Sequence, residues 1–238
     1  RQIDMGAGGR GRGAALGRPG YMTLGHALDF PDASHQALER RCFELCDLAF
    51  SHGVRHFDAA RSYGEAEAFL SRWLQTRSPT GVTISSKWGY RYTANWQRTA
   101  SSHEVKELTG SHFEQQWPQS RALLGPWLKV YQVHSATLDS GLFESKSLLS
   151  RLAQLRDEGV APGLSVTGAD QAATIRAAVR SRAFDWVQAT WNLLEPSAAP
   201  ALEEAKAAGL RVIIKEVFSN GRLSTRGDCA PLLDLARE

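Results

Sequence analysis

Four side chains with acid–base chemistry follow three consecutive β-rich segments of the chain. Asp58 lies at the end of one segment with Tyr63 five residues after it, and Lys87 and His134 end the next two segments. A charge buried at a strand end costs several kcal/mol unless it is paired. We therefore expect Asp58 and Lys87 to form an ion pair close to Tyr63 and His134.

This set of residues predicts a general acid directed at a carbonyl oxygen. A tyrosine hydroxyl has a pKa of about 10 in water, and a nearby cation lowers that pKa because it stabilises the phenolate. Lys87 would be this cation, Asp58 would keep it charged and oriented, and His134 would hydrogen-bond to a substrate oxygen. No side chain delivers an electron pair to the carbonyl carbon, so the chemistry needs a hydride donor such as a nicotinamide.

Short β-rich segments alternate with longer helical patterns along the chain. The expected strands lie near 13–17, 54–60, 82–88, 128–135, 161–168, 184–192 and 210–218. The expected helices lie near 35–52, 64–76, 111–125, 147–159, 170–182 and 198–209. The first helix has Ser34 as its expected N-cap and Gly53 as its stop. Such alternation is typical of βαβ units and a parallel sheet.

Two arrangements of these units compete, an open doubly wound sheet and a (β/α)8 TIM-type barrel. No G-x-G-x-x-G fingerprint follows the first clear strand, which disfavours a doubly wound dinucleotide-binding sheet. We predict an α/β fold of the barrel type, truncated before its eighth strand because only seven β-rich segments are present. Asp58, Lys87 and His134 then lie at the carboxyl ends of the strands, where such barrels place their active sites.

Composition places the chain among ordinary globular proteins. It has 238 residues, 42% of them apolar, and a formal charge of +3 that forms no single basic block, which argues against nucleic acid as a partner. No apolar run is long enough to span a membrane. The three cysteines fit a reducing compartment, so we expect a cytoplasmic protein. Residues 1–12 are expected to form a flexible lead-in and residues 13–238 a single barrel domain.

Five segments resemble the aldo-keto reductases, and in chain order they are FDAARSYGEAE, SSKWG, YQVHS, GLSVTG and VQATWN. The resemblance covers about residues 10 to 230. The resemblance implies a (β/α)8 barrel that binds NADPH, or less often NADH, and reduces an aldehyde or ketone to an alcohol. It implies a catalytic tetrad with Tyr63 as the proton donor, formed by Asp58, Tyr63, Lys87 and His134. An alternative is a non-catalytic binding module, either a truncated pseudoenzyme or a cofactor-sensing subunit.

The resemblance also implies residues that hold the cofactor. Ser165 and Gln188 match positions that bind the nicotinamide carboxamide, and FSNGRL matches a loop whose backbone N–H groups receive the pyrophosphate. The expected cofactor-binding residues are Ser165, Gln188, Lys215, Ser219, Gly221 and Leu223. Many relatives have an aromatic residue that stacks on the nicotinamide where this chain has Lys215 and Glu216, so stacking is absent or comes from Phe218.

A polar and aromatic stretch over 89–112 follows the strand that carries Lys87. A long loop at the catalytic face is usually functional or mobile, so we interpret this stretch as a substrate lid. The expected substrate pocket contains Trp88, Tyr90, Trp96 and Trp191. We expect no metal site, and solvent or loop positions for His26, His52, His56, His103 and His112.

A barrel with seven strands has two open edges. Three arrangements would resolve them: a longer protein supplies the rest, a second copy pairs edge to edge, or the Gly- and Arg-rich opening segment covers the gap. The closing residues PLLDLARE are typical of an interrupted helix, which favours a fragment. The family's eighth strand and its adenine-binding helix would follow Glu238, so the pattern specifies neither the substrate nor the choice of NADP over NAD.

Overall fold

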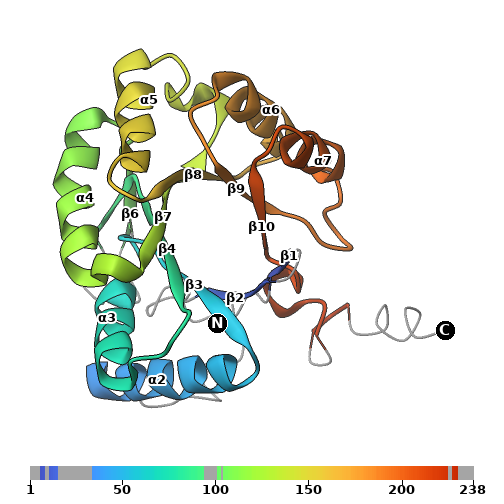
Figure 1. The fold of residues 1–238 in the computed structure, drawn as a ribbon. Helices are drawn as coiled ribbons and strands as arrows, with labels where there is room; N and C mark the ends of the chain where they lie inside the picture. Colours follow the sequence, from blue (N-terminus) through green and yellow to red (C-terminus); the bar gives the residue numbers. More distant parts are fainter. Residues whose placement is uncertain are drawn as a thin grey trace.

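The computed structural model describes residues 6–8, 11–15, 34–93, 101–102, 104–224 and 227–229. A ring of strands lies at the centre and the helices lie outside it (Figure 1). In their order around the ring, the strands are β1 (Gly6–Gly8), β2 (Gly11–Ala15), β3 (Val54–Asp58), β4 (Thr83–Trp88), β7 (Leu128–Ala136), β8 (Ala161–Val166), β9 (Trp186–Thr190) and β10 (Arg211–Lys215).

Seven of these strands run parallel to one another. Each pairing is parallel from β2 through β3, β4, β7, β8 and β9 to β10. These strands coincide with the seven expected segments and differ from them only at their ends. The prediction of a (β/α)8-type barrel that lacks part of its strand set is therefore confirmed.

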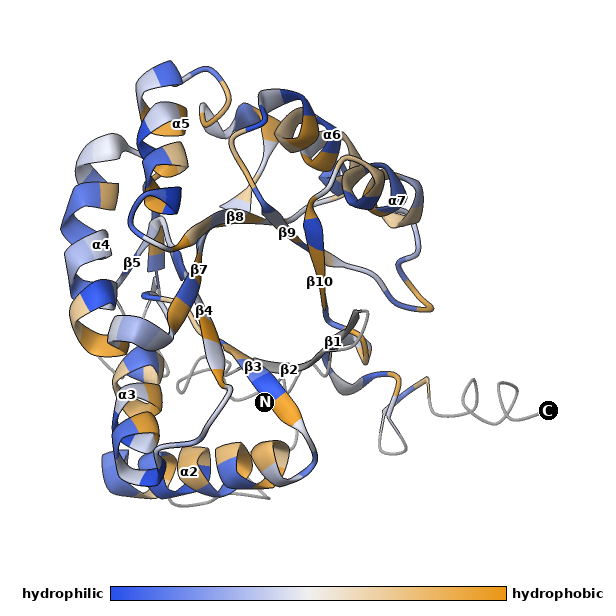
Figure 2. Cartoon of the chain, in the orientation of Figure 1, coloured by the Kyte–Doolittle hydropathy of each residue, from blue (hydrophilic) through white to orange (hydrophobic). Residues whose placement is uncertain are grey.

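The surrounding helices mix hydrophobic and hydrophilic residues, as expected where one side of a helix covers a sheet (Figure 2). They are α2 (His35–Ser51), α3 (Ala66–Arg77), α4 (Gly110–Leu124), α5 (Lys146–Ala153), α6 (Gln171–Ser181) and α7 (Ala199–Ala207). The predicted ends of the first helix are confirmed. Ser34 Oγ accepts a hydrogen bond from Ala37 N at 3.3 Å, and Gly53 follows the helix with φ of 85°.

Alternation along the strands separates an apolar layer from a polar interior, because successive side chains point to opposite faces. Phe57 and Trp88 are fully buried on the helix side of the ring. The Trp88 ring meets Phe113 of α4 edge-on, with ring centroids 5.0 Å apart. Their strand neighbours Asp58 and Lys87 contact each other inside the ring. The strands therefore present chemistry to the interior and apolar surface to the helices.

The stretch 89–112, which we expect to be a long loop and a substrate lid, contains a short hairpin, so the expectation of a loop without strands is wrong. β5 (Tyr90–Tyr92) pairs antiparallel with β6 (Glu104–Lys106), and Tyr90 is opposite Lys106. Gln116 of α4 anchors the hairpin base: its Oε1 accepts from Gly89 N and its Nε2 donates to Tyr90 O, both at 2.9 Å. The hairpin follows β4 directly and so stands at the carboxyl ends of the strands.

The gap left by the missing eighth strand lies between β2 and β10. β1 pairs antiparallel with β2, with Gly6 opposite Gly13, and it also lies beside β10 (Figure 1). Residues of the Gly- and Arg-rich opening segment therefore occupy this gap. The stretch 1–12 that we expect to be a lead-in thus contains β1 and the start of β2.

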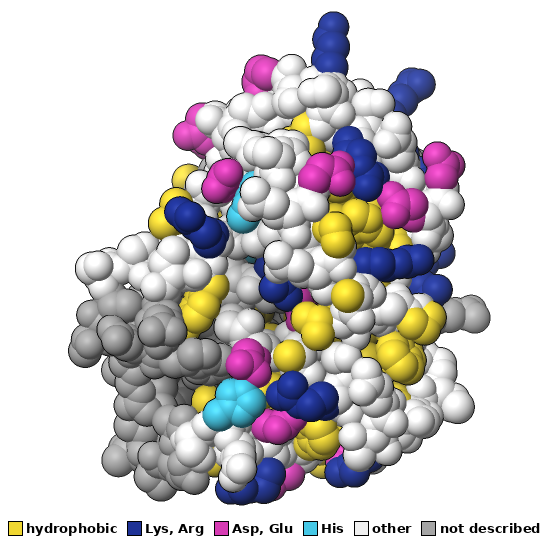
Figure 3. All heavy atoms as spheres, turned by 90° about the vertical axis from the view of Figure 1, so that its left-hand side faces the viewer, with side chains coloured by type: hydrophobic (Ala, Val, Ile, Leu, Met, Phe, Trp, Pro, Cys, Tyr) yellow, Lys and Arg dark blue, Asp and Glu magenta, His cyan; other side chains and the backbone are white. Residues whose placement is uncertain are grey.

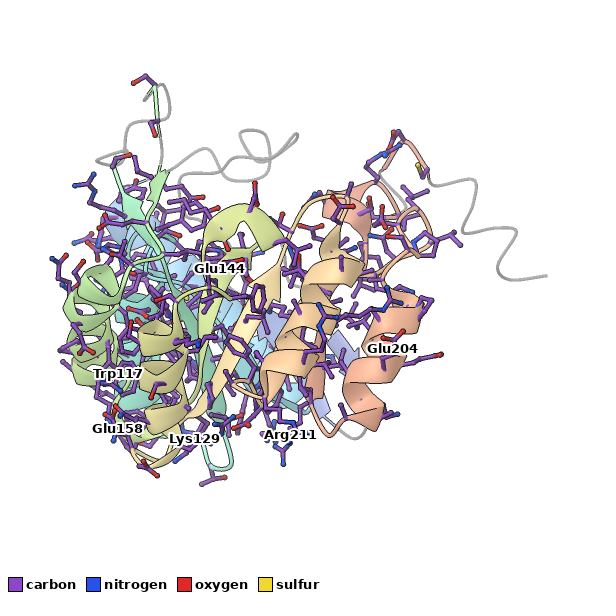
Figure 4. All side chains as sticks on the ribbon, turned by 90° about the horizontal axis from the view of Figure 1, so that it is seen from above. Trp117, Lys129, Glu144, Glu158, Glu204 and Arg211 are labelled. Carbon is purple, nitrogen blue, oxygen red and sulfur yellow. The ribbon has the colours of Figure 1, made fainter. Side chains whose placement is uncertain are left out.

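The outer surface carries charges of both signs. On the face shown in Figure 3, acidic and basic side chains lie beside one another between small hydrophobic areas. Lys129 of β7 and Arg211 of β10 both lie at the edge of the ring where the strands begin (Figure 4). Cys42, Cys46 and Cys229 are free thiols. In the part of the chain that the structure describes, no helix combines the length and hydropathy needed to cross a membrane.

Candidate active site

Asp58 is the centre of a buried polar cluster inside the ring. It ends β3 and is only 4% exposed. One carboxylate oxygen accepts from Ser85 Oγ and from Gln132 Nε2 at 3.1 Å, and the other accepts from Lys87 Nζ and from Gln188 Nε2 at 3.1 Å. An ionised carboxylate accepts about four hydrogen bonds, so these four donors saturate Asp58 and fix its orientation.

The Lys87 ammonium lies between Asp58 and Tyr63 and contacts both side chains. Its side chain is 2% exposed, and its Nζ donates to Ala59 O at 2.9 Å as well as to Asp58. The ammonium lies 5.4 Å from the centroid of the Tyr63 ring. The turn that carries Tyr63 is fixed to the same strand, since Arg61 N donates to Lys87 O at 2.9 Å. A paired cation is thus held against the tyrosine.

His134 lies on the other side of Tyr63. Its Nε2 is 3.4 Å from the Tyr63 hydroxyl, and its Nδ1 is 3.4 Å from Ser62 Oγ. The imidazole meets two tyrosine rings edge-on, with centroids 5.3 Å from Tyr63 and 5.0 Å from Tyr90. Tyr90 belongs to the hairpin, so the hairpin contributes a wall to the site.

Glu67 of α3, which was not predicted from the sequence, supports the site from the helix side of the strands. The carboxylate is 1% exposed, forms an ion pair with Arg61, and accepts a hydrogen bond from Ser86 Oγ at 2.5 Å. Arg61 lies two residues before Tyr63, and Ser86 immediately precedes Lys87. Glu67 therefore holds in place both the segment that carries Tyr63 and the segment that carries Lys87. The signal in the sequence was an acidic residue among the apolar positions of a helix.

Asp58, Lys87 and His134 lie at the carboxyl ends of three neighbouring parallel strands, and Tyr63 follows the first of these strands. The sequence model of the aldo/keto reductase family matches residues 21–231. The chain is a member of this family. The family assignment supports an oxidoreductase. A comparison with curated protein sequences finds no match.

Solved aldo-keto reductases share the fold. A Pseudomonas aeruginosa protein assigned to this family is 24% identical, with a TM-score of 0.63 over 84% of this chain and 71% of that one. A glycerol dehydrogenase from Gluconobacter oxydans is 17% identical, with a TM-score of 0.64 over 94% of this chain. A Klebsiella pneumoniae aldo-keto reductase, solved with NADPH, is 16% identical, with a TM-score of 0.52 over 75%. This chain spans 65% and 58% of the latter two chains.

Two buried side chains of this aldo-keto reductase have polar groups that fit a carboxamide. Ser165 and Gln188 are cross-strand partners on β8 and β9. Ser165 Oγ accepts from Ser135 N at 2.8 Å, which leaves its hydroxyl proton as a donor. Gln188 uses its Nε2 on Asp58, which leaves its Oε1 as an acceptor. A nicotinamide carboxamide has one acceptor oxygen and one donor nitrogen, so the two residues complement it.

The loop after β10 does not present its amides as the resemblance implies. The N–H groups of Ser219, Gly221 and Leu223 donate to carbonyls of Glu216 and Phe218. These amides are therefore committed within the loop, and a pyrophosphate would have to displace those bonds. Two further residues expected at the cofactor differ in exposure. Lys215 is partly buried, with its Nζ 3.8 Å from Glu216 Oε1, whereas the Phe218 side chain is 47% exposed.

The expected substrate pocket is only partly assembled by the structure. The ring of Tyr90 lies against His134. Trp88 packs against the helices instead, because it alternates with Lys87 along β4 and so points out of the ring. Trp191 follows β9 and is 45% exposed. Trp96 lies outside the described residues.

Two histidines expected in solvent or loops are buried or partly buried, so that expectation is wrong for them. His112 is buried on α4, and His56 lies on the interior face of β3 with its ring stacked on Trp186 at 5.7 Å. Burial lowers the pKa of His56, and the charge of Lys87 lowers it further, against the opposing effect of Asp58. His52 is exposed, and His26 and His103 lie outside the described residues.

Ser85 and Gln132 complete the shell around Asp58 and were not predicted from the sequence. Each stands two residues before a predicted site residue, Ser85 before Lys87 and Gln132 before His134. The period of two along a strand places such residues on the same interior face, so the signal was present. Within the described ranges, no three His, Cys, Asp or Glu side chains come together as a metal site would require.

Proposed function

We propose that this chain is an NADPH-dependent oxidoreductase that reduces an aldehyde or ketone to an alcohol, with Tyr63 as the proton donor. One observation carries the proposal. A tyrosine hydroxyl, a buried ammonium paired with a carboxylate, and an imidazole meet at the carboxyl end of a barrel. Acid–base chemistry on a carbonyl oxygen uses this combination.

Lys87 and Asp58 prepare Tyr63 for proton transfer. The Lys87 ammonium stabilises the phenolate that Tyr63 becomes when it gives its proton to the carbonyl oxygen. Asp58 keeps Lys87 charged at a place where an unpaired ammonium would be unstable. Because all four acceptor positions of Asp58 are occupied, the pair is already oriented before substrate arrives, and little reorganisation opposes the reaction.

His134 orients the substrate oxygen. Ser62 Oγ contacts Nδ1 of the imidazole, and Nε2 faces the Tyr63 hydroxyl. With Nε2 protonated, the ring donates a hydrogen bond to the same oxygen that receives the Tyr63 proton. The Tyr63 and Tyr90 rings on either side limit rotation of the imidazole.

Ser165 and Gln188 would hold the nicotinamide carboxamide, since their remaining donor and acceptor complement it. When bound, a reduced nicotinamide supplies the hydride that no side chain provides. Two Klebsiella pneumoniae aldo-keto reductases of the same fold were solved with NADPH and with NADP and acetate, which supports the phosphorylated cofactor.

A fluorescence titration followed by an activity assay tests the proposal. The chain has seven tryptophans, and NADPH bound near them is expected to quench their emission. Oxidation of NADPH is then followed with a panel of aldehydes and ketones. Quenching together with carbonyl-dependent oxidation supports the proposal. Quenching without turnover of any carbonyl favours the non-catalytic binding module, and no quenching up to millimolar NADPH contradicts cofactor binding by this chain.

A further inference from the structure

We propose that His56 is a positioning residue that acts on Asp58 through Ser85. The inference rests on the proposed function, because it concerns the carboxylate that orients Lys87. His56 Nε2 lies 2.9 Å from Ser85 Oγ, and Ser85 Oγ donates to Asp58. The polar chain inside the ring therefore extends beyond the four expected catalytic residues, toward the end where the strands begin.

The register of β3 and β4 builds this chain. Asp58 is the cross-strand partner of Ser85, and His56 is the partner of Thr83. His56 and Asp58 lie two residues apart and share the interior face of β3, as do Thr83 and Ser85 on β4. The Ser85 hydroxyl consequently stands between the imidazole and the carboxylate and contacts both.

Counting protons fixes the direction of these hydrogen bonds. An ionised Asp58 accepts only, and Ser85 has a single hydroxyl proton, which it gives to Asp58. Ser85 Oγ must then accept from His56, so Nε2 of His56 carries a proton. His56 Nδ1 lies 3.2 Å from Thr83 Oγ1. The single Thr83 hydroxyl proton has two acceptors within reach, Nδ1 of the neutral ring and Arg55 O at 3.4 Å, and Nδ1 is the nearer of the two.

This tautomer has a consequence for the site. If His56 carried its proton on Nδ1 instead, Nε2 would become an acceptor and compete with Asp58 for the Ser85 proton. Asp58 would then lose one of its four donors. The orientation of its carboxylate toward the Lys87 ammonium would be less firmly fixed. With Nε2 protonated, Asp58 is the acceptor for the Ser85 hydroxyl proton. His56 thereby keeps the carboxylate saturated without touching it.

The surroundings of His56 favour a neutral ring in a fixed orientation. The imidazole stacks on Trp186 of β9, with 15° between the ring planes, and the Arg211 guanidinium lies 5.3 Å from the centroid of the same indole. Stacking opposes a flip of the imidazole, and the contacts of Nδ1 with Thr83 and of Nε2 with Ser85 give each nitrogen its own partner. The charged groups that act on the ring from inside the barrel are Asp58 and Lys87.

Nitrogen NMR of histidine-labelled protein tests the tautomer without any assay of activity. The His56 resonance is identified by its loss in the His56→Phe variant. At neutral pH we expect a neutral ring protonated at Nε2, and we expect its Nε2–H resonance to shift in the Ser85→Ala variant. A ring protonated at Nδ1, a cationic ring, or an Nε2–H resonance unaffected by Ser85→Ala would overturn the proposal, whether or not the chain reduces carbonyls.

Kinetics test the positioning role with matched variants. His56→Phe retains an aromatic ring but cannot donate, and we expect kcat to fall about 3- to 10-fold, the effect of one ordinary hydrogen bond. His56→Gln places a donor near the former Nε2 and should recover most of the loss, and His52→Phe on the surface should change nothing.

The decisive comparison uses Ser85→Ala as the background. If His56 acts through Ser85, His56→Phe costs little further kcat once the Ser85 hydroxyl is gone, and KM for NADPH is unchanged throughout. An equal fall in kcat in both backgrounds would show that His56 does not act through Ser85 and would overturn the proposal. Failure of His56→Gln to recover kcat, in a variant that melts like wild type, would overturn it as well.

Discussion

Lys87 donates to Asp58 inside the ring of strands, where both side chains are almost fully removed from water. Removal of one partner of such a pair leaves the other charge buried and unpaired. This relationship connects stability and chemistry in the same two residues, because the ammonium whose loss would leave Asp58 unpaired is also the one held against Tyr63.

Removal of the Lys87 charge is expected to cost both turnover and stability. Lys87→Met keeps the apolar part of the side chain, and we expect the free energy of unfolding to fall by about 3–5 kcal/mol because Asp58 is left unpaired. Urea melts give this value. The double variant with Asp58→Asn should lose less than the sum of the two single variants, and strict additivity would show that the two side chains are not energetically coupled.

The stability of the chain is expected to fall as the pH falls below about 6.5, partly through His56. Burial lowers the pKa of this ring in the folded state, so the unfolded chain takes up the proton first. Folding therefore gains stability from the neutral ring above the unfolded pKa and loses it as the pH decreases. Urea midpoints at about pH 7.5 and about pH 5.5 should differ less in His56→Phe than in wild type. An equal difference in both would contradict this, and His52→Phe is the control.

Gly163 of β8 is expected to tolerate no side chain. A Cβ at this position would lie 2.9 Å from Gln132 Cγ and 3.2 Å from Trp186 Cβ inside the ring. Gly163→Ala should destabilise the fold by about 1–3 kcal/mol, the usual effect of overpacking. Gly110→Ala is the control, because no atom lies within 4 Å of that Cβ. Thermal melts compare the two, and equal melting temperatures would contradict the packing described for the interior.

Much of the fold and the centre of the site could be predicted from the sequence. The β-rich composition of the segments predicted the strands. In a barrel of parallel strands, a titratable residue at the carboxyl end of a strand lies at the edge where active sites form. Asp58, Lys87 and His134 were found in this way. Tyr63, five residues after Asp58, was expected to be a general acid because a nearby Lys87 would lower its pKa, and the resemblance to a family gave it the same role.

The remaining residues escaped because composition alone does not say which face of a strand is interior. Trp88 was expected in the pocket although it alternates with Lys87, and Ser85 and His56 share the interior face but look unremarkable in sequence. Tyr90 and Lys106 belong to strands of three residues each, too short for a pattern to emerge. The two strands pair with each other, and Gln116 of α4 holds the base of the hairpin that they form.

The central claim is that Tyr63 gives the proton, and Tyr63→Phe tests it most directly. The variant removes a single hydroxyl, so NADPH affinity should be unchanged. Tyr131→Phe is the matched control, because that hydroxyl contacts Ser120 in the core, behind the site.

The measurement is kcat for NADPH-dependent reduction of the best carbonyl substrate, in wild type and both variants. We expect Tyr63→Phe to lower kcat by about 10²- to 10⁴-fold, the usual contribution of general acid catalysis, while Tyr131→Phe stays close to wild type. A Tyr63→Phe variant that binds NADPH normally and keeps kcat within about threefold of wild type would contradict the account, since that is far below the effect of a general acid.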